Sequence, residues 1–137
     1  MLCSTEMETD HAYVRVLIAD DQPSFRHAAR SVVELTPGFV VAGEAESGEA
    51  AVDAARGERP DLVLMDVHLP GIDGLEASRR ILAASDGKQP VIFLLSTYEA
   101  AEYLEEPTEC GAAAYLTKAE FGSERLAAAW AAANASA

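Results

Sequence analysis

Five side chains of this sequence are of the types that phosphoryl transfer needs, and each stands at or just after the end of a short apolar run. They are Asp20, Asp21, Asp66, Ser96 and Lys118. Clustered carboxylates repel one another unless a cation neutralises them, and Mg²⁺ prefers oxygen ligands. An aspartate beside such a cation can attack phosphorus as a nucleophile, while an ammonium group and a hydroxyl can stabilise the transferred oxygens. The set therefore predicts Mg²⁺-dependent transfer of a phosphoryl group to one carboxylate.

Asp66 is the central residue of the set and has three possible interpretations. It lies in "LVLMDVHLPGIDG" (62–74), where it could be the phosphate acceptor or an ordinary polar residue at the end of a strand. The same residues also spell D-x-H-x-x-G, the signature in which a histidine, here His68, ligates the cobalt of cobalamin. Cobalamin-binding domains carry that motif after the first strand and need a glycine-rich loop near the end. Here it follows the third apolar run, and the late segment "CGAAAYL" has one glycine, so cobalamin is disfavoured.

The other members of the set also have structural interpretations. Asp20 or Asp21 could be the N-cap of a helix that starts nearby, without excluding metal binding by the other. Lys118 taken alone could be an ordinary surface lysine. Ser96 and Thr97 both follow the same apolar run, and the spacing favours Ser96 as the hydroxyl of the site.

The elements that must position these residues alternate along the chain. Five short apolar runs predict strands, at 13–19, 39–45, 61–65, 90–95 and 112–117. Segments of helical periodicity predict helices, at 23–35, 47–57, 73–85, 98–106 and 123–135. Ser47 is the expected N-cap of the second helix, and the last helix is expected to place Leu126, Ala127 and Trp130 along one side. Strands separated by helices imply a parallel sheet with right-handed crossovers, an α/β sandwich in which helices cover both faces. Ligands of such folds bind beyond the carboxyl ends of the strands, which is where the five polar residues are expected.

The bulk composition limits the partners. The chain has 137 residues, which suits one domain, and a formal net charge of −13. We expect a poorly ordered lead-in at 1–12 and one domain at 13–137. The acidic balance argues against direct contact with nucleic acid or an anionic membrane. Cys3 and Cys110 form no C-x-x-C pair, so two reduced thiols in a cytoplasmic protein are expected.

Four segments together resemble a known family, the receiver domains of two-component response regulators. They are "DD" (20–21), "LMDVHLPGIDG" (64–74), "FLLSTYEA" (93–100) and "GAAAYLTK" (111–118). Their order and separations resemble those of the family, with 45 residues from Asp21 to Asp66, 30 more to Ser96 and 22 more to Lys118. The resemblance covers roughly residues 13 to 135. It implies a flavodoxin-like (βα)5 doubly wound sandwich with a five-stranded parallel sheet.

The resemblance also implies a role for each matching residue. Asp66 would accept the phosphoryl group, and Mg²⁺ would be held by Asp66, directly by Asp21, largely through water by Asp20, and by the backbone carbonyl of His68. Ser96 would be the switch hydroxyl and Lys118 would pair with the phosphate. Tyr115 would be the aromatic switch that turns inward on activation. Pro70 and Gly74 match the loop after the acceptor.

The implied partners are proteins. A histidine kinase or phosphotransfer protein would donate the phosphoryl group, a downstream protein target would read the switch, and a homodimer could form through the fourth helix, fifth strand and fifth helix. The domain would be a signalling module rather than an enzyme acting on a separate substrate. Two alternatives remain open: a receiver fragment of a DNA-binding regulator, and a pseudo-receiver that binds partners without being phosphorylated.

Two departures from the family pattern lead to expectations about geometry. Ala119 follows Lys118 where the family usually has a proline after a cis bond, so we expect a trans Lys118–Ala119 bond. Pro107 falls where the fourth helix would normally continue. We therefore expect that helix to end near Glu105 or to be kinked.

Overall fold

The computed structural model describes residues 13–97 and 110–135. The expected lead-in, the helix at 98–106 and its end near Glu105 lie outside the described residues. Five strands are observed, β1 (Val14–Ala19), β2 (Phe39–Ala45), β3 (Leu62–Asp66), β4 (Val91–Ser96) and β5 (Ala114–Thr117). The helices are α2 (Pro23–Leu35), α3 (Gly48–Glu58), α4 (Gly74–Ala84), the short 3₁₀ helix η2 (Lys118–Glu120) and α6 (Ser123–Ala135). The strands and the helices α2, α3, α4 and α6 each lie within two residues of the predicted ranges, whereas η2 was not predicted.

The five strands form one sheet in the order β2-β1-β3-β4-β5, and every neighbouring pair is parallel. The chain leaves β1 to form β2 on one side and then crosses to form β3 on the other. The order of the strands therefore reverses between β1 and β3, the position at which α/β sheets bind ligands. The flavodoxin-like fold class predicted from the sequence is confirmed.

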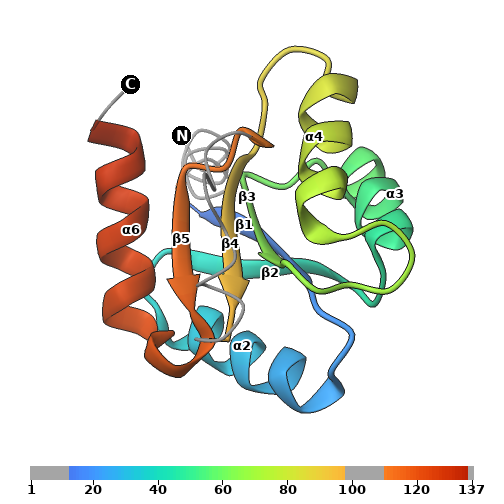
Figure 1. Ribbon diagram of the computed structural model, residues 1–137. Helices are drawn as coiled ribbons and strands as arrows, with labels where there is room; N and C mark the ends of the chain where they lie inside the picture. The colour runs from blue at the N-terminus through green and yellow to red at the C-terminus, as the bar shows by residue number, and fades with distance from the viewer. Residues whose placement is uncertain (1–12, 98–109, 136–137) are drawn as a thin grey trace.

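Helices cover both faces of the sheet, as Figure 1 shows, with α2 and α6 on one side and α3 and α4 on the other. Successive strand residues alternate between the two faces because the side-chain period of a strand is two. Leu17, Val63 and Leu94 belong to the core beneath α3 and α4. Ile18 and Leu64, each one position along its strand, belong to the core beneath α2 and α6. Because both faces are buried, β3 needs the continuous apolar run that its sequence shows.

The starts of the helices follow the capping residues in the sequence. Ser47 caps α3 by accepting a hydrogen bond from the backbone N–H of Ala50 at 3.0 Å, as predicted. Asp73 caps α4 in the same way. The predicted end of α3 at Gly57 is one residue early. The helix continues to Glu58, and Arg59 rather than a glycine takes the left-handed conformation that ends it, with φ of 50°.

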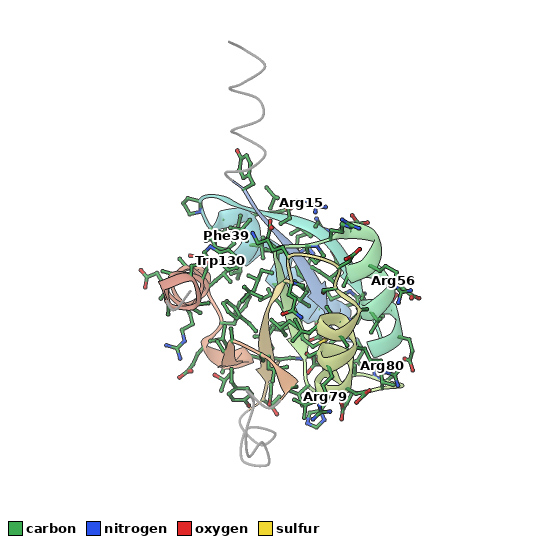
Figure 2. The ribbon with its side chains drawn as sticks, turned by 90° about the horizontal axis from the view of Figure 1, so that it is seen from above. Arg15, Phe39, Arg56, Arg79, Arg80 and Trp130 are labelled. Atoms are coloured by element: carbon green, nitrogen blue, oxygen red, sulfur yellow. The ribbon has the colours of Figure 1, made fainter. Side chains whose placement is uncertain are left out.

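The last helix, α6, packs against α2 and the sheet through Leu126 and Trp130. The ring of Trp130 meets Phe39 edge to face, with centroids 6.1 Å apart, as Figure 2 shows. Leu126 is fully buried, as the predicted apolar face requires. The prediction that Ala127 shares this face is wrong, because Ala127 is exposed and Ala129 packs there instead. The helix is so rich in alanine that its sequence periodicity barely distinguishes the two faces.

Among residues 13–97 and 110–135, no helix combines the length and apolar character that crossing a membrane requires.

Candidate functional site

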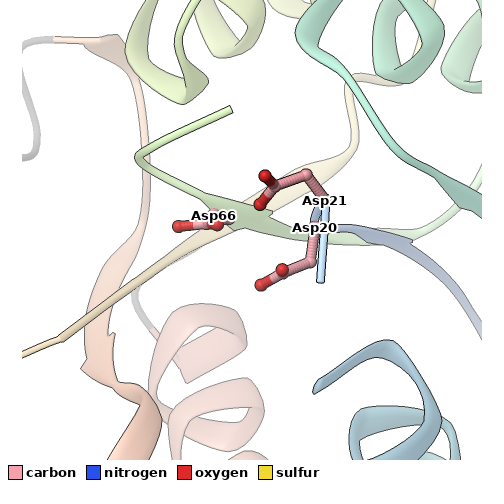
Figure 3. Close-up of side chains that lie close together, drawn as sticks. All are labelled: Asp20, Asp21 and Asp66. Atoms are coloured by element: carbon pink, nitrogen blue, oxygen red, sulfur yellow. The ribbon is translucent and has the colours of Figure 1, made fainter. Parts of the chain in front are cut away.

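Three carboxylates meet at the carboxyl end of the sheet, as Figure 3 shows. Asp20 and Asp21 follow β1 directly, and Asp66 is the last residue of β3. One carboxylate oxygen of each lies within 4.8 Å of those of the other two. Because β1 and β3 are neighbours in the sheet, the switch in strand order places acids 45 residues apart side by side. The three oxygens could hold one cation.

The three acids differ in exposure. Asp20 is fully buried and Asp66 is 4% exposed, whereas Asp21 is exposed to solvent. The buried carboxylate of Asp20 is oriented by the backbone, because its Oδ1 accepts a hydrogen bond from the N–H of Gln22 at 2.8 Å. Arg26 donates to the carbonyl of Asp20 at 2.7 Å. The site thus has two inner acids in fixed positions and one acid at its mouth.

Lys118, which follows the outer strand β5, adds a positive charge to the three acids. Its Nζ lies 2.6 Å from Oδ2 of Asp20 and 3.4 Å from Oδ2 of Asp66. Its side chain is only 15% exposed, and its ammonium lies 4.6 Å from the centroid of the Phe25 ring. The surface-lysine interpretation is therefore wrong. No peptide bond among the described residues is cis, so the Lys118–Ala119 bond is trans, as expected.

The environment of Asp66 disfavours its charged form. Burial, and after it the negative charge of Asp20, raise the pKa of the Asp66 carboxyl above its ordinary value. The hydrogen bond from the His68 amide to Oδ1, at 3.1 Å, and the ammonium of Lys118 lower that pKa and only partly offset the rise. A buried carboxylate beside another carboxylate is the situation that a bound cation relieves.

The candidate switch hydroxyl, Ser96, is the last residue of β4 and is 1% exposed. Its Oγ donates a hydrogen bond to the backbone carbonyl of Thr97 at 2.8 Å. The neighbouring Thr97 is exposed. Ser96 ends β4, which is the neighbour of β3 in the sheet. Of the two hydroxyl residues, Ser96 is therefore the one at the same end of the sheet as Asp66.

Tyr115 lies on β5, beside Leu94 of β4. Its ring is partly buried and packs against the core beneath α3 and α4. Its hydroxyl oxygen is buried and has no hydrogen-bond partner within residues 13–97 and 110–135. A buried phenol that lacks a partner is costly, which marks this side chain as one that could gain by changing position.

The loop from β3 to α4 (67–73) passes close to the site because α4 begins almost against the acceptor strand. A Cβ atom placed on Gly74 would lie 2.1 Å from the carbonyl oxygen of Asp66. The N–H of Gly74 donates to the carbonyl of Val67 at 2.9 Å. Glycine at this position therefore allows a turn that no larger residue could make. The side chain of His68 is exposed to solvent.

Sequence reasoning missed a second contact that holds the same loop. Oε2 of Glu49, in the first turn of α3, accepts a hydrogen bond from the N–H of Ile72 at 3.3 Å. The N–H of Gly48 donates to the carbonyl of Pro70, also at 3.3 Å. A Cβ atom on Gly71, where φ is +78°, would lie 2.2 Å from Oε1 of Glu49. Gly48 and Gly71 were the features of the sequence that could have indicated this close approach. They are more than 20 residues apart, however, and no sequence pattern links them.

The capping interpretation of the acidic pair is also wrong. The N-cap of α2 is Gln22, with no hydrogen bond from a side chain, and Pro23 occupies the first turn. Neither Asp20 nor Asp21 is used for this purpose. The polar residues predicted at strand ends thus lie together at the carboxyl end of the sheet. Tyr115 lies on the outer strand β5, next to the β4 strand that carries Ser96.

Comparison with known proteins agrees with this geometry. A sequence model of the family described as "Response regulator receiver domain" matches residues 16–131. The transcriptional regulatory protein YxjL of Bacillus subtilis (strain 168) is 38% identical over 105 residues, which cover 77% of this chain and 47% of that protein. A protein-glutamate methylesterase/protein-glutamine glutaminase of Alkalilimnicola ehrlichii is 37% identical over 106 residues, covering 77% of this chain and 27% of that protein.

The solved structures give the same result. The signal receiver domain of NarL from Mycobacterium tuberculosis superposes with a TM-score of 0.78 at 28% identity, covering 89% of this chain and 97% of that one. The chain belongs to the response regulator receiver domain family of two-component systems, and the domain is regulatory. It spans about half or less of the curated relatives named above.

Proposed function

We propose that Asp66 is the phosphate acceptor of this receiver domain. The observation that supports the proposal most directly is that Asp20, Asp21, Asp66 and Lys118 lie together at the carboxyl end of the sheet. In the reaction, a carboxylate oxygen of Asp66 attacks the phosphorus of a phosphohistidine. The new O–P bond forms as the P–N bond breaks, and the imidazole nitrogen leaves with the electron pair and takes up a proton. Asp66 is suited to this role because it ends the central strand β3, with a carboxylate already oriented by the His68 amide.

The residues present fit a Mg²⁺ ion. Oxygen ligands are what this cation prefers, and three carboxylates of which two are buried would need such a charge beside them. Asp21 and Asp66 would bind it directly, Asp20 largely through water, and the carbonyl of His68 would complete the protein ligands. The cation would neutralise charge on the transferred phosphoryl group.

Lys118 and Ser96 would hold the phosphate once it is attached. The ammonium of Lys118 already lies 3.4 Å from the acceptor carboxylate, so it can move from acid to phosphate with little displacement. Ser96 would have to release the carbonyl of Thr97 to donate to a phosphate oxygen. Because that exchange requires phosphate, it would couple modification to a change of conformation. Tyr115, whose hydroxyl lacks a described partner, would be the aromatic side chain that follows.

The partners follow from this chemistry. A histidine kinase or a phosphotransfer protein would supply the phosphoryl group, and a downstream protein target would bind the altered surface. Two copies of the domain could also form a homodimer through the helix expected at 98–106, β5 and α6. One named relative is a transcriptional regulator and another is a methylesterase, so the same domain type serves different outputs.

The test uses acetyl phosphate and Mg²⁺ with the wild type, Asp66→Asn and Asp53→Asn, with intact mass as the readout. Asp53 is the matched control because it is an exposed aspartate of α3 whose ion pair, to Arg56, is long at 3.9 Å. We expect one phosphoryl group on the wild type and on Asp53→Asn, none on Asp66→Asn, and none when EDTA removes the metal. If the wild type stays unmodified where a known receiver domain is labelled, the chain is a pseudo-receiver.

A further inference from the structure

The opposite end of the molecule holds a cavity that the phosphoryl-transfer site does not use. It has a volume of about 350 Å³ and lies between the C-terminal halves of α3 and α4 and the loops that follow them. Figure 1 shows these two helices side by side on one face of the sheet. Those loops lead into the starts of β3 and β4, so the cavity is separated from Asp66 by the length of the strands. Its size is within the range of small-molecule sites in proteins.

The cavity has apolar walls and a charged rim. Val52 and Ala55 of α3 and Ile81 of α4 line the wall, and Ile81 belongs to the buried core. The rim includes three cations, Arg56, Arg59 and Lys88, and two carboxylates, Asp61 and Asp86. The rim therefore has one more positive than negative charge in a chain whose net charge is −13. Three of the ten lysines and arginines gather at this single place.

Two of these cations have no charged partner, in contrast to most others in the chain. Arg15, Arg26, Arg30, Arg79, Arg80 and Lys118 each pair with a carboxylate at 3.6 Å or less. Within the described parts of the chain, Arg59 and Lys88 form no ion pair and no side-chain hydrogen bond, and the same holds for Arg125, which is elsewhere on the surface. In a protein this rich in acids, two unpaired cations at one cavity are available to bind an anionic ligand.

The helix ends do not account for these two cations. Carbonyl groups at helix C-termini attract positive charge, and this explains Arg56 in the last turn of α3. The carbonyls of Glu58 and Arg59, however, already accept hydrogen bonds from Arg15 at 2.5 and 2.9 Å. At the end of α4, the carbonyl of Leu82 accepts from Gln89 at 2.8 Å. Other residues thus already engage these carbonyls, and no hydrogen bond among the described residues uses the side chains of Arg59 and Lys88 for capping.

Among the described residues, the two carboxylates of the rim form no ion pair with Arg59 or Lys88. Oδ2 of Asp61 is engaged by the backbone N–H of Arg15 at 2.9 Å. Asp86 is exposed at the outer edge and forms no ion pair within the described residues.

We propose that this cavity binds a small amphipathic anion, with its apolar body between α3 and α4 and its carboxylate at Arg59 and Lys88. The apolar wall supplies the burial and the two unpaired cations supply the specificity for negative charge. The lining of the site includes neither Asp66 nor any other member of the acidic cluster. It is a second binding site of the domain, at the amino ends of the strands.

The test titrates ¹⁵N-labelled protein with decanoate, below its micelle-forming concentration, and with decyltrimethylammonium, which has the same alkyl chain and the opposite charge. The net charge of −13 favours the cationic compound at most of the surface. Preference for the anion at the cavity therefore isolates the effect of the local cations. We expect decanoate to shift the amide signals of 52–61 and 81–90 with saturation, and decyltrimethylammonium to shift them at least tenfold more weakly.

Two variants separate charge from shape. The double variant Arg59→Gly/Lys88→Gln removes both charges, and glycine suits the left-handed backbone at position 59, so the variant should fold. Ala84→Phe places a ring in the cavity from an exposed lining position. Arg125→Gln is the matched control, since Arg125 is an unpaired cation away from the cavity. We expect at least tenfold weaker decanoate binding in the first two variants and no change in the third.

Three results would overturn the proposal. The first is the absence of saturable shifts at the cavity in the wild type. The second is equal binding of the two compounds of opposite charge. The third is unchanged decanoate affinity in the double variant when its spectrum shows a folded protein.

Discussion

Asp66 carries its carboxylate at 4% exposure beside the fully buried Asp20, and both acids face one ammonium group, that of Lys118. The raised pKa of Asp66 means that folding without a metal disfavours the charged form of this carboxyl relative to the unfolded chain. A neutral side chain of the same shape should therefore suit the metal-free fold better at neutral pH.

We accordingly expect Asp66→Asn to raise the unfolding free energy at pH 7.5 in EDTA by about 1 kcal/mol, or about 3–6 °C in Tm. Thermal unfolding followed by circular dichroism measures this change. Asp53→Asn, which removes an equal charge from the exposed face of α3, should leave Tm within about 1 °C of the wild type. A lower Tm for Asp66→Asn would contradict this account of the acidic cluster.

Tyr115 supports a second prediction for a single residue. Its hydroxyl is buried without a hydrogen-bond partner among the described residues, so removing that oxygen removes a desolvation cost. Tyr115→Phe should raise the unfolding free energy of the unphosphorylated protein by about 0.5–1 kcal/mol, measured by urea denaturation. If the ring is also the switch that we propose, the variant should keep its phosphorylation rate. A stability loss above about 1 kcal/mol would mean that the hydroxyl has a partner in the folded protein.

Residue identities at the site could be predicted, but their energetic states could not. Asp20, Asp66 and Lys118 each follow or end a predicted strand, which was enough to expect them near one another. The carboxyl ends of parallel strands lie at the same end of the sheet. Whether Lys118 is a surface lysine or a buried partner depends on its distance to the acids, which only the folded chain defines. The same holds for the burial that shifts the pKa of Asp66.

The loop 67–73, between β3 and α4, is held in place by α3. Glu49 accepts from the Ile72 N–H, and Gly48 and Gly71 allow the two backbones to approach. This loop contains His68, the residue whose carbonyl we propose as a metal ligand. A loop held less firmly should position that carbonyl less well, although Glu49 itself is exposed and contacts the loop rather than the acceptor.

We expect Glu49→Ala to slow acetyl phosphate labelling severalfold and to weaken Mg²⁺ binding, while lowering stability by only about 0.5–1 kcal/mol. Glu49→Gln keeps an oxygen acceptor for the Ile72 N–H and should restore most of the rate. Asp53→Ala, one turn further along the same helix, is the control, because the Asp53 side chain pairs with Arg56 and not with the loop. If Glu49→Gln is as slow as Glu49→Ala, the charge of Glu49 rather than its hydrogen bond to the loop is responsible.

Secondary structure elements were largely predictable, since strands buried on both faces and helices with apolar periodicity carry strong patterns. The errors lie where tertiary packing decides. Arg59 rather than Gly57 takes the left-handed position, because Arg15 binds the carbonyls at the end of α3 and stabilises that turn. In α6, Ala127 and Ala129 are chemically identical, so their different burial follows only from the neighbours they meet.

At the scale of the whole molecule, the chain carries a net charge of −13 and concentrates three carboxylates at one end of its sheet. A cation bound there would neutralise the acids that repel one another, and it would bind the folded state because unfolding separates β1 from β3. Ligand binding of this kind stabilises a protein by about 1.4 kcal/mol when the free ligand is ten times its dissociation constant. General screening by salt also stabilises an acidic protein, so the comparison must hold ionic strength constant.

We therefore expect MgCl₂ to raise Tm of the wild type by about 3–6 °C relative to KCl at equal ionic strength, and EDTA to reverse the gain. The shift should fall to about 1 °C or less in Asp21→Asn, which removes the exposed acid that we propose as a direct ligand. It should persist in Asp53→Asn, because Asp53 lies on the outer surface of α3. Equal shifts in wild type and Asp21→Asn would show that Mg²⁺ stabilises the protein without Asp21, and the proposed metal site would then be wrong even if Asp66 were phosphorylated.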